Sequence, residues 1–354
     1  MQFSKRIHLD DIDRVLYHAG CGDWQTSRAC VADGFGGAYA FWSKLKQNQS
    51  VEYIGCGHYP NEKLITEMCG HNVVMVDICF EKDFMLKLEK VCNRLIVLDH
   101  HKTTPEQLPQ SLQEYSIVDM TKSGCALAWE YCYGLQALAE SEDQYQEWLS
   151  GARPKQEPLP LFLAYIQDRD LWAWKLPETK AFTTAFYGSI PFEFEEYHRF
   201  RSESEVVKMI NKGNTILEYN NKQIENLLRG TYETTFLGYQ VAVVESGMYQ
   251  SELGSSLNAR DGIDFAMIWR YNHHDDNIKV CLRSKDHKVD VSEIAKCFGG
   301  GGHRNVSGFV WKGNSIKKLL KEEKKKYKWF KLGALCFGMG FLGYLSGRYT
   351  NKNK

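Results

Sequence analysis

The sequence predicts an α/β protein of two domains, and three observations carry this prediction. Short apolar runs alternate with helix-like segments through the first half of the chain, which is typical of βαβ units and a parallel sheet. A long polar helical segment then separates this half from a stretch in which strand-like and helix-like segments alternate again. The 354 residues suffice for two such cores and an appendage. We therefore expect a first domain over 1–200, a connector helix over 201–230, a smaller α/β domain over 231–318 and a tail over 319–354.

The first domain is expected to alternate four strands with helices. Each predicted strand is short and apolar, and Ser123 is expected to cap one helix at its N-terminus. The strands are predicted at Arg14–Tyr17, Val51–Ile54, Asn72–Asp77 and Arg94–Asp99. The helices are predicted at Gly36–Leu45, from about Asn61, at Leu86–Val91 and Gly124–Tyr133, and from about Ala164 to Trp172.

The second domain is expected to combine three strands with two helices. A polar helix from about Ser202 to Leu228 leads into it. The strands are predicted at Thr234–Val244, Phe265–Tyr271 and Ile278–Arg283, and the helices at Leu253–Ala259 and Val291–Phe298.

Composition narrows the class of protein. Lysine plus arginine equals aspartate plus glutamate at 44 each, which argues against a protein that coats long duplex nucleic acid. A small anionic substrate in a local pocket is compatible with this balance. The 11 cysteines are odd in number and include no C-x-x-C pair, and no apolar secretory signal follows Met1. We therefore expect a reducing compartment and no thiolate zinc site.

Two apolar runs end abruptly in titratable side chains. Residues 94–98 are followed by Asp99, His100 and His101, and the run before Asp77 also ends in a carboxylate. Because open α/β sheets bind ligands at the carboxyl ends of their strands, we expect these side chains to meet in one site. Carboxylates suit Mg²⁺, and carboxylates with imidazoles suit Mn²⁺. One or two such ions beside a phosphorus atom would activate a water and stabilise the displaced oxygen.

Asp99-His100-His101 after an apolar strand resembles the signature of the DHH phosphoesterase superfamily. The segment "FGGGGHRNVSGF", Phe298–Phe309, resembles the glycine-rich motif of the C-terminal domain that accompanies this superfamily, and "VCLRSK", Val280–Lys285, resembles the strand before that motif. Asp33–Trp42 and Gln167–Trp174 resemble the first and fourth motifs of a subgroup near the nanoRNases. The resemblance covers nearly everything but the tail.

The resemblance implies roles for individual residues. Asp77 would bridge two ions, and Asp99 would orient the imidazoles and fix their tautomer. His101 would lie close to the ions and the scissile phosphate, where it polarises the phosphoryl group or the leaving oxygen. Asp170 is a rival to Asp168 as the acidic ligand of the fourth motif. The implied ligands of the Mn²⁺ or Mg²⁺ ions are His18, Asp33, Asp77, His100 and Asp168.

Two departures from the family pattern concern the first motif. The family has a second aspartate two positions after the first, where this chain has Phe35, so one ion site would lack a ligand. His18 also lies farther from Asp33 than in relatives, because a short insertion separates them. Asp23 stands at the usual distance from His18, but the glycines after Asp33 match the rest of the motif better, so Asp33 is the preferred ligand. The alternative is that the insertion distorts the site and costs activity.

The glycine run Gly299–Gly302 suits the binding of an anion. Without β-carbons its backbone can approach a phosphate closely and adopt positive φ, so that its N–H groups converge on the phosphate. Arg283 can hold a phosphate with two parallel hydrogen bonds. The substrate would then occupy the cleft between the two domains. The expected substrate-binding residues are Arg283, Ser284, Gly300, Gly301, Gly302, His303 and Arg304.

The tail predicts a membrane anchor. A lysine-rich segment over 321–331 precedes an uncharged run over 332–347, which at about 1.5 Å per residue spans roughly 24 Å of the ~30 Å hydrocarbon core. Lys331 and Arg348 could snorkel to the interfaces, so the run can still cross. The spacing Gly343-x-x-x-Gly347 is compatible with pairing of two such helices in a homodimer. The alternative is a buried or amphipathic C-terminal helix.

An anchor at this position would leave the enzyme domains facing the cytosol. Its short apolar run and basic flanks look similar to those of tail-anchored proteins of the mitochondrial outer membrane, with the endoplasmic reticulum or the peroxisome as alternatives.

Together these features predict a membrane-anchored, metal-dependent hydrolase of phosphodiester bonds in short oligonucleotides or small nucleotides. The alternative enzyme is an exopolyphosphatase or pyrophosphatase; base-stacking aromatics in the second domain's pocket would favour nucleotides, and a purely basic channel would favour polyphosphate. The alternative from another class is a catalytically inactive membrane adaptor that keeps the fold. Phe35 and the insertion favour the adaptor, whereas buried charges that cost stability weigh against it.

Overall fold

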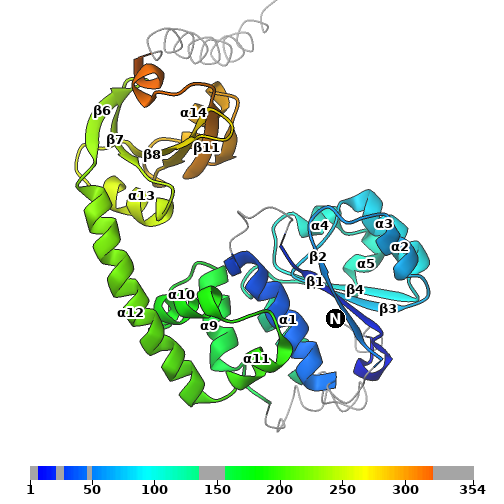
Figure 1. The fold of residues 1–354 in the computed structure, drawn as a ribbon. Coiled ribbons are helices and arrows are strands. Elements are labelled where there is room, and N and C mark those ends of the chain that lie inside the picture. Colours follow the sequence, from blue (N-terminus) through cyan, green and yellow to red (C-terminus); the bar gives the residue numbers. More distant parts are fainter. Residues whose placement is uncertain (1–6, 21–27, 46–49, 135–155, 322–354) are drawn as a thin grey trace, which may run out of the picture. The chain divides into compact units, whose positions relative to one another are not determined.

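The computed structural model describes residues 7–20, 28–45, 50–134 and 156–321 of the chain (Figure 1). The chain divides into two compact units, Met1–Glu218 and Tyr219–Lys354, and we describe each by itself. The division falls inside α12, Glu203–Leu228, a helix of 26 residues. Two glutamates in the first turn of α12 complement the positive end of the helix dipole.

The first unit contains a sheet of five parallel strands in the order β2-β1-β3-β4-β5. Strand β1 lies between β2 and β3. The connection from β1 to β2 runs to one side of β1, and the strands from β3 onward lie on its other side, so the strand order reverses between β1 and β3. In open α/β sheets, ligands bind beside such a reversal, at the carboxyl ends of the strands. The strands are β1 Arg14–His18, β2 Glu52–Cys56, β3 Asn72–Val76, β4 Arg94–Asp99 and β5 Ile117–Val118.

Alternate side chains of this sheet pack into two different cores. On β3, Val74 and Val76 join the core that includes α1 and α6, whereas Val73 and Met75 join the core that includes α2 and α3. Figure 1 shows helices on both faces of the sheet. Because both faces are buried, the strands are continuous apolar runs, as expected for a parallel sheet. The four helices are α1 Arg28–Leu45, α2 Lys63–Glu67, α3 Lys82–Val91 and α6 Gly124–Tyr133.

Further helices pack their aromatic side chains against α1. The ring centroids of Tyr39 and Phe162 lie 5.5 Å apart, and those of Phe162 and Tyr197 lie 6.0 Å apart. These rings are buried, so the packing fixes the position of α9 relative to α1. The helices are α9 Leu161–Asp170, α10 Thr179–Ser189 and α11 Phe194–Arg199; shorter turns are α4 Thr104–Gln107, α5 Gln110–Gln113 and the 3₁₀ turn Leu9–Asp11.

The second unit contains a mixed sheet of six strands in the order β10-β11-β9-β8-β7-β6. Only the β7–β8 pairing is parallel among its described strands. One core lies between the sheet and α14, Val291–Cys297, and the other includes α13, Gln250–Asn258. The strands are β6 Tyr232–Phe236, β7 Tyr239–Glu245, β8 Phe265–Asn272, β9 Asn277–Arg283, β10 Gly301–His303 and β11 Val306–Trp311.

The predicted α/β class and parallel first sheet are confirmed, but several elements differ from the prediction. The predicted strand Thr234–Val244 is a hairpin, because Leu237 and Gly238 both adopt positive φ, at 51° and 80°. Such a two-residue turn matches the twist of the flanking strands. Helix α1 begins at Arg28 rather than Gly36, so Asp33 lies on a helix and not in a turn. Helices α4, α5, α10 and α11 and strands β5 and β10 were not predicted.

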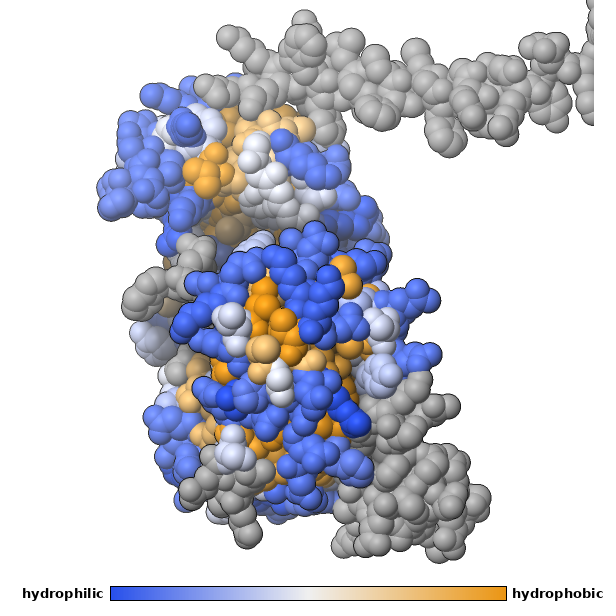
Figure 2. All heavy atoms as spheres, turned by 90° about the vertical axis from the view of Figure 1, so that its right-hand side faces the viewer, coloured by the Kyte–Doolittle hydropathy of each residue, from blue (hydrophilic) through white to orange (hydrophobic). Residues whose placement is uncertain are grey.

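The predicted anchor over 332–347 lies outside the described residues. Within the described part of the chain, no helix is both long enough and apolar enough to cross a membrane. Figure 2 shows one face of the molecule, on which hydrophilic side chains predominate and apolar side chains appear in separate areas between them.

Candidate metal centre

Five segments of the first unit bring titratable side chains together at the carboxyl end of the sheet. The ends of β1, β3 and β4 contribute from the sheet itself, beside the point where the strand order reverses. Helix α1 contributes from one face, and the last turn of α9 contributes from farther along the chain. The side chains are His18, Asp33, Asp77, Asp99, His100, His101 and Asp170.

Asp77 is the centre of this group. It follows β3 directly and adopts a left-handed backbone with φ of 58°, which is unusual for a residue other than glycine. One carboxylate oxygen lies 3.1 Å from His100 Nε2, and the other lies 3.5 Å from His18 Nδ1. Burial alone would raise the pKa of Asp77, but its contacts with His100 and His18 hold that pKa below the usual range. Asp77 therefore remains a carboxylate that presents both oxygens to imidazoles.

Asp33 is held by the N-terminus of α6. Its two oxygens accept hydrogen bonds from the backbone N–H groups of Gly124 and Cys125, at 2.6 and 3.0 Å. Asp33, rather than the predicted cap Ser123, thus satisfies these free helix donors; the Ser123 hydroxyl lies instead 3.3 Å from the Cys125 sulfur. Burial and the neighbouring Asp77 charge raise the pKa of Asp33. The following residue, Gly34, packs so closely on His18 that a β-carbon would lie 2.4 Å from the His18 carbonyl oxygen.

His100 connects three carboxylates. Its Nε2 lies 3.1 Å from Asp77, 3.3 Å from Asp170 and 3.8 Å from Asp33. Burial acts to lower the pKa of His100, but the bond to Asp77 and the surrounding negative charges raise it to about 9. Burial, followed by the charges of Asp33 and Asp77, raises the pKa of Asp170 to about 8. This is the electrostatic pattern of a site that lacks positive charge, since carboxylates so close together repel one another.

The structure does not bring the predicted ligand Asp168 together with the side chains of this group. Both of its oxygens are engaged elsewhere: Oδ1 accepts from the Lys175 N–H at 2.7 Å, and Oδ2 accepts from the Leu176 N–H at 3.2 Å and from the Thr179 hydroxyl. Asp168 and Asp170 are two residues apart on α9, so their side chains leave the helix in different directions. Asp170, the rival candidate, faces His100, and we assign the proposed ligand role to it.

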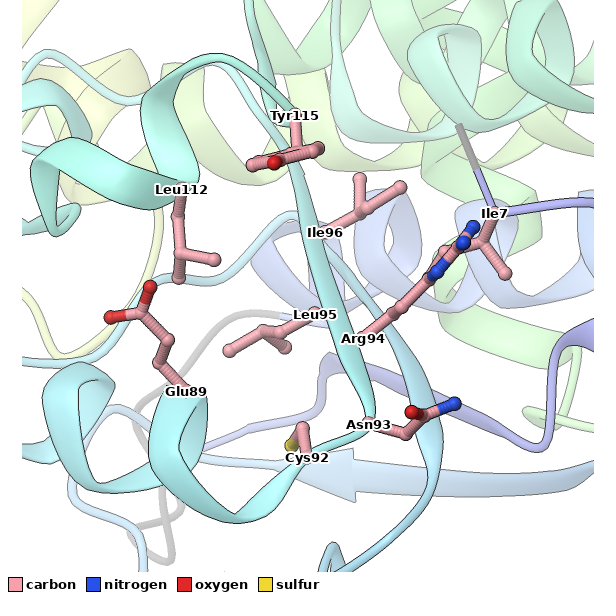
Figure 3. Close-up of a pocket in the computed structure, with 9 residues that line it drawn as sticks. All are labelled: Ile7, Glu89, Cys92, Asn93, Arg94, Leu95, Ile96, Leu112 and Tyr115. Carbon is pink, nitrogen blue, oxygen red and sulfur yellow. The ribbon is translucent and has the colours of Figure 1, made fainter. Parts of the chain in front are cut away.

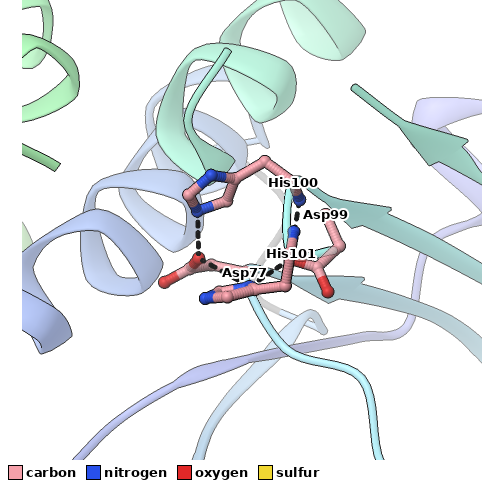
Figure 4. A group of neighbouring side chains, drawn as sticks. All are labelled: Asp77, Asp99, His100 and His101. Atoms are coloured by element: carbon pink, nitrogen blue, oxygen red, sulfur yellow. Dashed lines mark hydrogen bonds and ion pairs between the residues drawn. The ribbon is translucent and has the colours of Figure 1, made fainter. Parts of the chain in front are cut away.

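Asp99 contacts the imidazole of His101 and the backbone of His100 (Figure 4). Its Oδ1 lies 2.8 Å from His101 Nδ1 and also accepts from the His100 backbone N–H at 2.8 Å. Its Oδ2 accepts from the Thr104 hydroxyl, a buried partner that the sequence did not single out. Through these contacts Asp99 holds the ring of His101 in place. The hydrogen bond to Asp99 also raises the pKa of His101, whose side chain is 44 % exposed.

The residues of this group fit a divalent metal ion of the Mn²⁺ or Mg²⁺ kind. The side chains form two sets, and within each set the donor atoms lie within 4.8 Å of one another. One set is Asp77, Asp99, His100 and His101, and the other is Asp33, His100 and Asp170. His18 Nε2 is buried and has no hydrogen-bond partner among the described residues, which is costly unless a ligand meets it. A cation would relieve both the repulsion between carboxylates and this unpaired nitrogen.

Phe35 and His58 are two further residues of interest beside the predicted ligands. Phe35 does not face the ligands but stacks on Phe194 at 4.8 Å, inside the aromatic core. The position of the missing second aspartate is therefore filled by a structural side chain. His58, after β2, was not predicted; its ring centroid lies 4.7 Å from that of His18. Burial and the neighbouring His18 and His101 lower the pKa of His58, so it is held neutral beside the site. Asp23 lies outside the described residues.

The glycine motif of the second unit is an edge strand with a turn and not a free loop. Gly301 and Gly302 pair with Gly308 and Ser307 of β11. A β-carbon at Gly300 would lie 2.1 Å from the Gly308 carbonyl oxygen, so glycine is needed there for close packing. Positive φ, as predicted, occurs at Gly299 and at Gly302.

The side chains predicted to bind substrate in this unit divide into two groups. Arg304 donates to the carbonyl oxygens of Asp286 and Lys288, at 3.2 and 3.0 Å, and contacts Asp290 at 3.4 Å. It thereby holds the loop before α14, so its predicted role at the substrate is not supported. Arg283 lies across Gly254 of α13 and donates within the described structure to the neighbouring Leu282 carbonyl oxygen. The adjacent Ser284 hydroxyl is buried without a partner among the described residues, and His303 is exposed on β10.

A hollow of about 460 Å³ lies at the opposite end of β4 (Figure 3). It is lined by the first residues of that strand together with Ile7, Glu89 and Tyr115. Its nine lining residues include no imidazole and a single carboxylate, so they do not reproduce the donor group at Asp99.

The fold and the site together define a two-unit α/β protein with a candidate divalent-metal centre at a reversal of strand order. No protein-family model matches the chain. An uncharacterized protein of Acanthamoeba polyphaga mimivirus is 32% identical over 334 residues, covering 90% of this chain and 71% of that protein. The oligoribonuclease NrnB of Bacillus subtilis is 26% identical over 232 residues, covering 60% of this chain and 51% of NrnB.

A solved structure shows the same fold. The exopolyphosphatase-related protein of Bacteroides fragilis superposes with a TM-score of 0.50 at 14% identity, covering 92% of this chain and 96% of that protein. The chain belongs to the DHH phosphoesterase superfamily, to which its Asp99-His100-His101 and glycine-rich motifs had assigned it. This chain spans about half of NrnB, so the activity of that protein is transferred to this one only as a proposal.

Proposed function

We propose that this protein is a metal-dependent hydrolase that cleaves phosphodiester bonds in short oligonucleotides or small nucleotides. The observation that carries the proposal is the position of Asp77, whose two oxygens face His100 and His18 within a buried group of carboxylates. The similarity to an oligoribonuclease supports the choice of substrate. A neutral net charge is in line with short substrates and not with long duplexes.

The residues that would hold the metal are His18, Asp33, Asp77, His100 and Asp170. A bound divalent ion would supply Lewis acidity toward phosphoryl oxygens and a lowered pKa of water. Phe35 stands where the family pattern has a second carboxylate, so one expected donor is missing. The number of ions that bind, one or two, depends on the donors that remain. Both donor sets share His100, which makes this residue the one on which either arrangement depends.

His101 is proposed to act on the scissile phosphate itself. Asp99 accepts a hydrogen bond from Nδ1–H of His101, which leaves Nε2 as the nitrogen that can face a substrate. The raised pKa of His101 favours its protonated form, which can give a proton to the leaving oxygen as the P–O bond breaks. Asp99 and Thr104 act through His101 by fixing its ring.

The second unit is proposed to bind the substrate through Arg283, Ser284, His303 and the glycines 300–302. The buried and unpaired Ser284 hydroxyl beside Arg283 supports this assignment, because an unsatisfied buried hydroxyl is costly until a ligand meets it. Arg304 is omitted, since its guanidinium holds the loop before α14.

The proposal is tested by hydrolysis assays on the purified chain with Mn²⁺. The substrates are di- to pentanucleotides, 3′-phosphoadenosine phosphate, cyclic dinucleotides and polyphosphate. We expect release of mononucleotides from the short oligonucleotides, and loss of this activity in His100→Ala with an unchanged circular dichroism spectrum.

The other outcomes separate the alternatives. Hydrolysis of polyphosphate alone would replace the proposed substrate with a phosphoanhydride. An absence of hydrolysis across the panel, in a folded protein that binds Mn²⁺, would favour the inactive adaptor.

We further propose, from the sequence alone, that residues 332–347 anchor the protein in a membrane, with the mitochondrial outer membrane favoured. Deletion of residues 328–354 is expected to move the protein from the membrane fraction into the soluble fraction of a cell lysate. A truncated chain that still sediments with membranes would contradict the anchor.

A further inference from the structure

The turn between α9 and α10 exposes two tryptophans. Trp172 is 60 % exposed and Trp174 is 36 % exposed, which is unusual for side chains with so large an apolar surface. Both residues adopt left-handed backbones, with φ of 54° and 52°. Residues other than glycine pay a conformational cost in this region, so the turn places both rings outward against the local preference of the chain.

Arg169 packs against both rings. Its guanidinium carbon lies 4.4 Å from the ring centroid of Trp172 and 4.8 Å from that of Trp174. The two indole rings are nearly perpendicular, with centroids 4.9 Å apart. The guanidinium therefore braces both rings and brings positive charge to them.

Asp168 holds this turn in place. Its carbonyl oxygen accepts from the backbone N–H groups of Ala173 and Trp174, at 2.9 and 3.5 Å. Its buried carboxylate accepts from the N–H groups of Lys175 and Leu176, at 2.7 and 3.2 Å. The turn is therefore fixed by a buried charge, and the rings are presented by a rigid support.

The tryptophans follow directly on a member of the metal centre. Asp170 Oδ2 lies 3.3 Å from His100 Nε2, and Trp172 is two residues farther along the chain. Two residues of extended chain span at most about 7 Å, so the backbone of Trp172 begins within that distance of Asp170. A dinucleotide whose phosphate reaches His100 is long enough for one of its bases to reach this turn.

We propose that Trp172 is a stacking surface for a base of the substrate, with Trp174 and Arg169 bracing it and Asp168 acting as a positioning residue. This inference rests on the proposed function and specifies its substrate class: a phosphodiester that carries a nucleobase, as opposed to an inorganic polyphosphate. Indole rings stack on every base, and a neighbouring guanidinium adds attraction for a planar ring and for a phosphate.

The size and charge of the surface favour a base over a partner protein. A stable protein interface buries about 800 Å² on each partner, whereas an aromatic side chain buries about 150–250 Å², so two partly exposed rings are too small to form one. Their position beside the proposed metal centre also favours a ligand that carries a phosphate, which a divalent ion held there would attract.

The test compares two substrates and three variants of the whole chain. One substrate is the 5′-phosphorylated dinucleotide of two adenosines, and the other is the same sugar–phosphate backbone without bases. The readout is the ratio of their kcat/KM values with Mn²⁺. In Trp172→Asn the ring is removed, but asparagine tolerates the left-handed backbone. Trp172→Tyr keeps an aromatic face, and Tyr219→Ala removes a comparably exposed ring, 62 % exposed, on α12.

We expect the wild type to prefer the base-containing substrate by about ten- to a hundredfold. Trp172→Asn should lose most of this preference through a higher KM, Trp172→Tyr should recover it, and Tyr219→Ala should retain it. Asp168→Asn should also reduce the preference. An unchanged preference in Trp172→Asn would overturn the stacking surface while leaving the proposed function standing.

A binding measurement separates failure of the inference from failure of the proposed function. Equilibrium dialysis with Mn²⁺ compares AMP with ribose 5-phosphate and needs no turnover. Tighter binding of AMP that disappears in Trp172→Asn supports the stacking surface even if no substrate is hydrolysed, and in that case the proposed hydrolase activity is what fails. Equal binding of the two ligands by the wild type would overturn the inference.

Discussion

The two sheets of this protein present their functional side chains in opposite ways. At the carboxyl edge of the parallel sheet, Asp33, Asp77 and Asp99 are buried and hydrogen-bonded to the groups around them. In the second unit, the predicted substrate-binding motif lies on the exposed edge strand β10. The first arrangement fixes donor atoms before any ligand arrives, whereas the second leaves an edge that can adjust to a ligand. A reaction that depends on exact distances is suited to the fixed donor atoms of the parallel sheet. Binding of a substrate is suited to the exposed edge strand of the second unit.

The largest effect on activity is expected from removing His100, the residue at the end of the first sheet that belongs to both sets of metal-donor atoms. In His100→Ala the imidazole common to both donor sets is lost, and we expect Mn²⁺-dependent hydrolysis to fall by about a hundredfold or more, since even the loss of a group behind a ligand costs about 10–100-fold. Steady-state kinetics on a dinucleotide measures this. A variant with unchanged kcat would show that the group is not the active site.

The two aspartates of helix α9 provide a matched pair within the first unit. Asp170→Asn should lose most of its activity and most of the rise in melting temperature that Mn²⁺ gives to the wild type, because its carboxylate faces His100. Asp168→Asn should keep the Mn²⁺-dependent rise in melting temperature, but its free energy of unfolding should be lower by about 2–4 kcal/mol. The reason is that a buried acceptor of three hydrogen bonds is replaced by an amide that offers a single acceptor oxygen.

Thermal unfolding of both variants with and without Mn²⁺ distinguishes the two roles. If Asp168→Asn abolished the Mn²⁺ effect while Asp170→Asn preserved it, the assignment of the ligand would have to be reversed.

A second matched pair sharpens the description of the other sheet. Arg283→Ala should raise KM by about tenfold with little change in kcat, the effect of losing one charge-assisted hydrogen bond to the substrate. Arg304→Ala should change KM little and instead lower the stability of the second unit, because its guanidinium holds Asp286, Lys288 and Asp290. Kinetics and urea unfolding of the two variants give both quantities; a fall in kcat alone for Arg283→Ala would contradict a role in binding.

The smallest expected effect concerns the cap of α14. Asp290 accepts from the Ser292 N–H at 3.0 Å, so Asp290→Ala should lower the free energy of unfolding by about 1 kcal/mol. The bonds from Ser292 lower the pKa of Asp290 from its ordinary 3.8. A lowered pKa means that the cap stabilises fully above pH 3.8, and its contribution disappears as the pH falls through the lowered pKa. Denaturant unfolding at pH 7 and at successively lower pH should therefore show a difference between wild type and variant that is largest at pH 7 and shrinks as the pH falls below 3.8.

Strand ends were predictable from the sequence, and the choice between neighbouring acids was not. Asp77 and Asp99 end apolar runs, and the geometry of a parallel sheet brings such positions together. Asp168 and Asp170 both end a helix, where residues two apart point about 200° away from each other. Which of the two faces the site depends on the turn after α9, where Trp172 and Trp174 adopt left-handed backbones. Tryptophan has no preference for that conformation, so no local pattern signals the turn.

Other features also escaped prediction. The hairpin at Leu237 and Gly238 lies inside the apolar run that was predicted as one strand, and leucine is not a residue that favours positive φ. Thr104 and His58 reach the site only because β4 and β2 end beside it. A polar residue within a few positions of a strand end is the signal that could have found both.

Gly124 packs closely against Asp77 and Asp33, and this contact matters for how a substitution at residue 124 is interpreted. By helix propensity alone, Gly124→Ala would count as an improvement of about 1 kcal/mol. Yet the added β-carbon would lie 2.5 Å from the β-carbon of Asp77 and 2.9 Å from an Asp33 oxygen. A scale that ranks substitutions by chemical similarity would score the change as harmless. In this protein a methyl group at residue 124 would displace Asp77 or Asp33, so we expect Gly124→Ala to disturb the candidate metal centre as a substitution of either acid would.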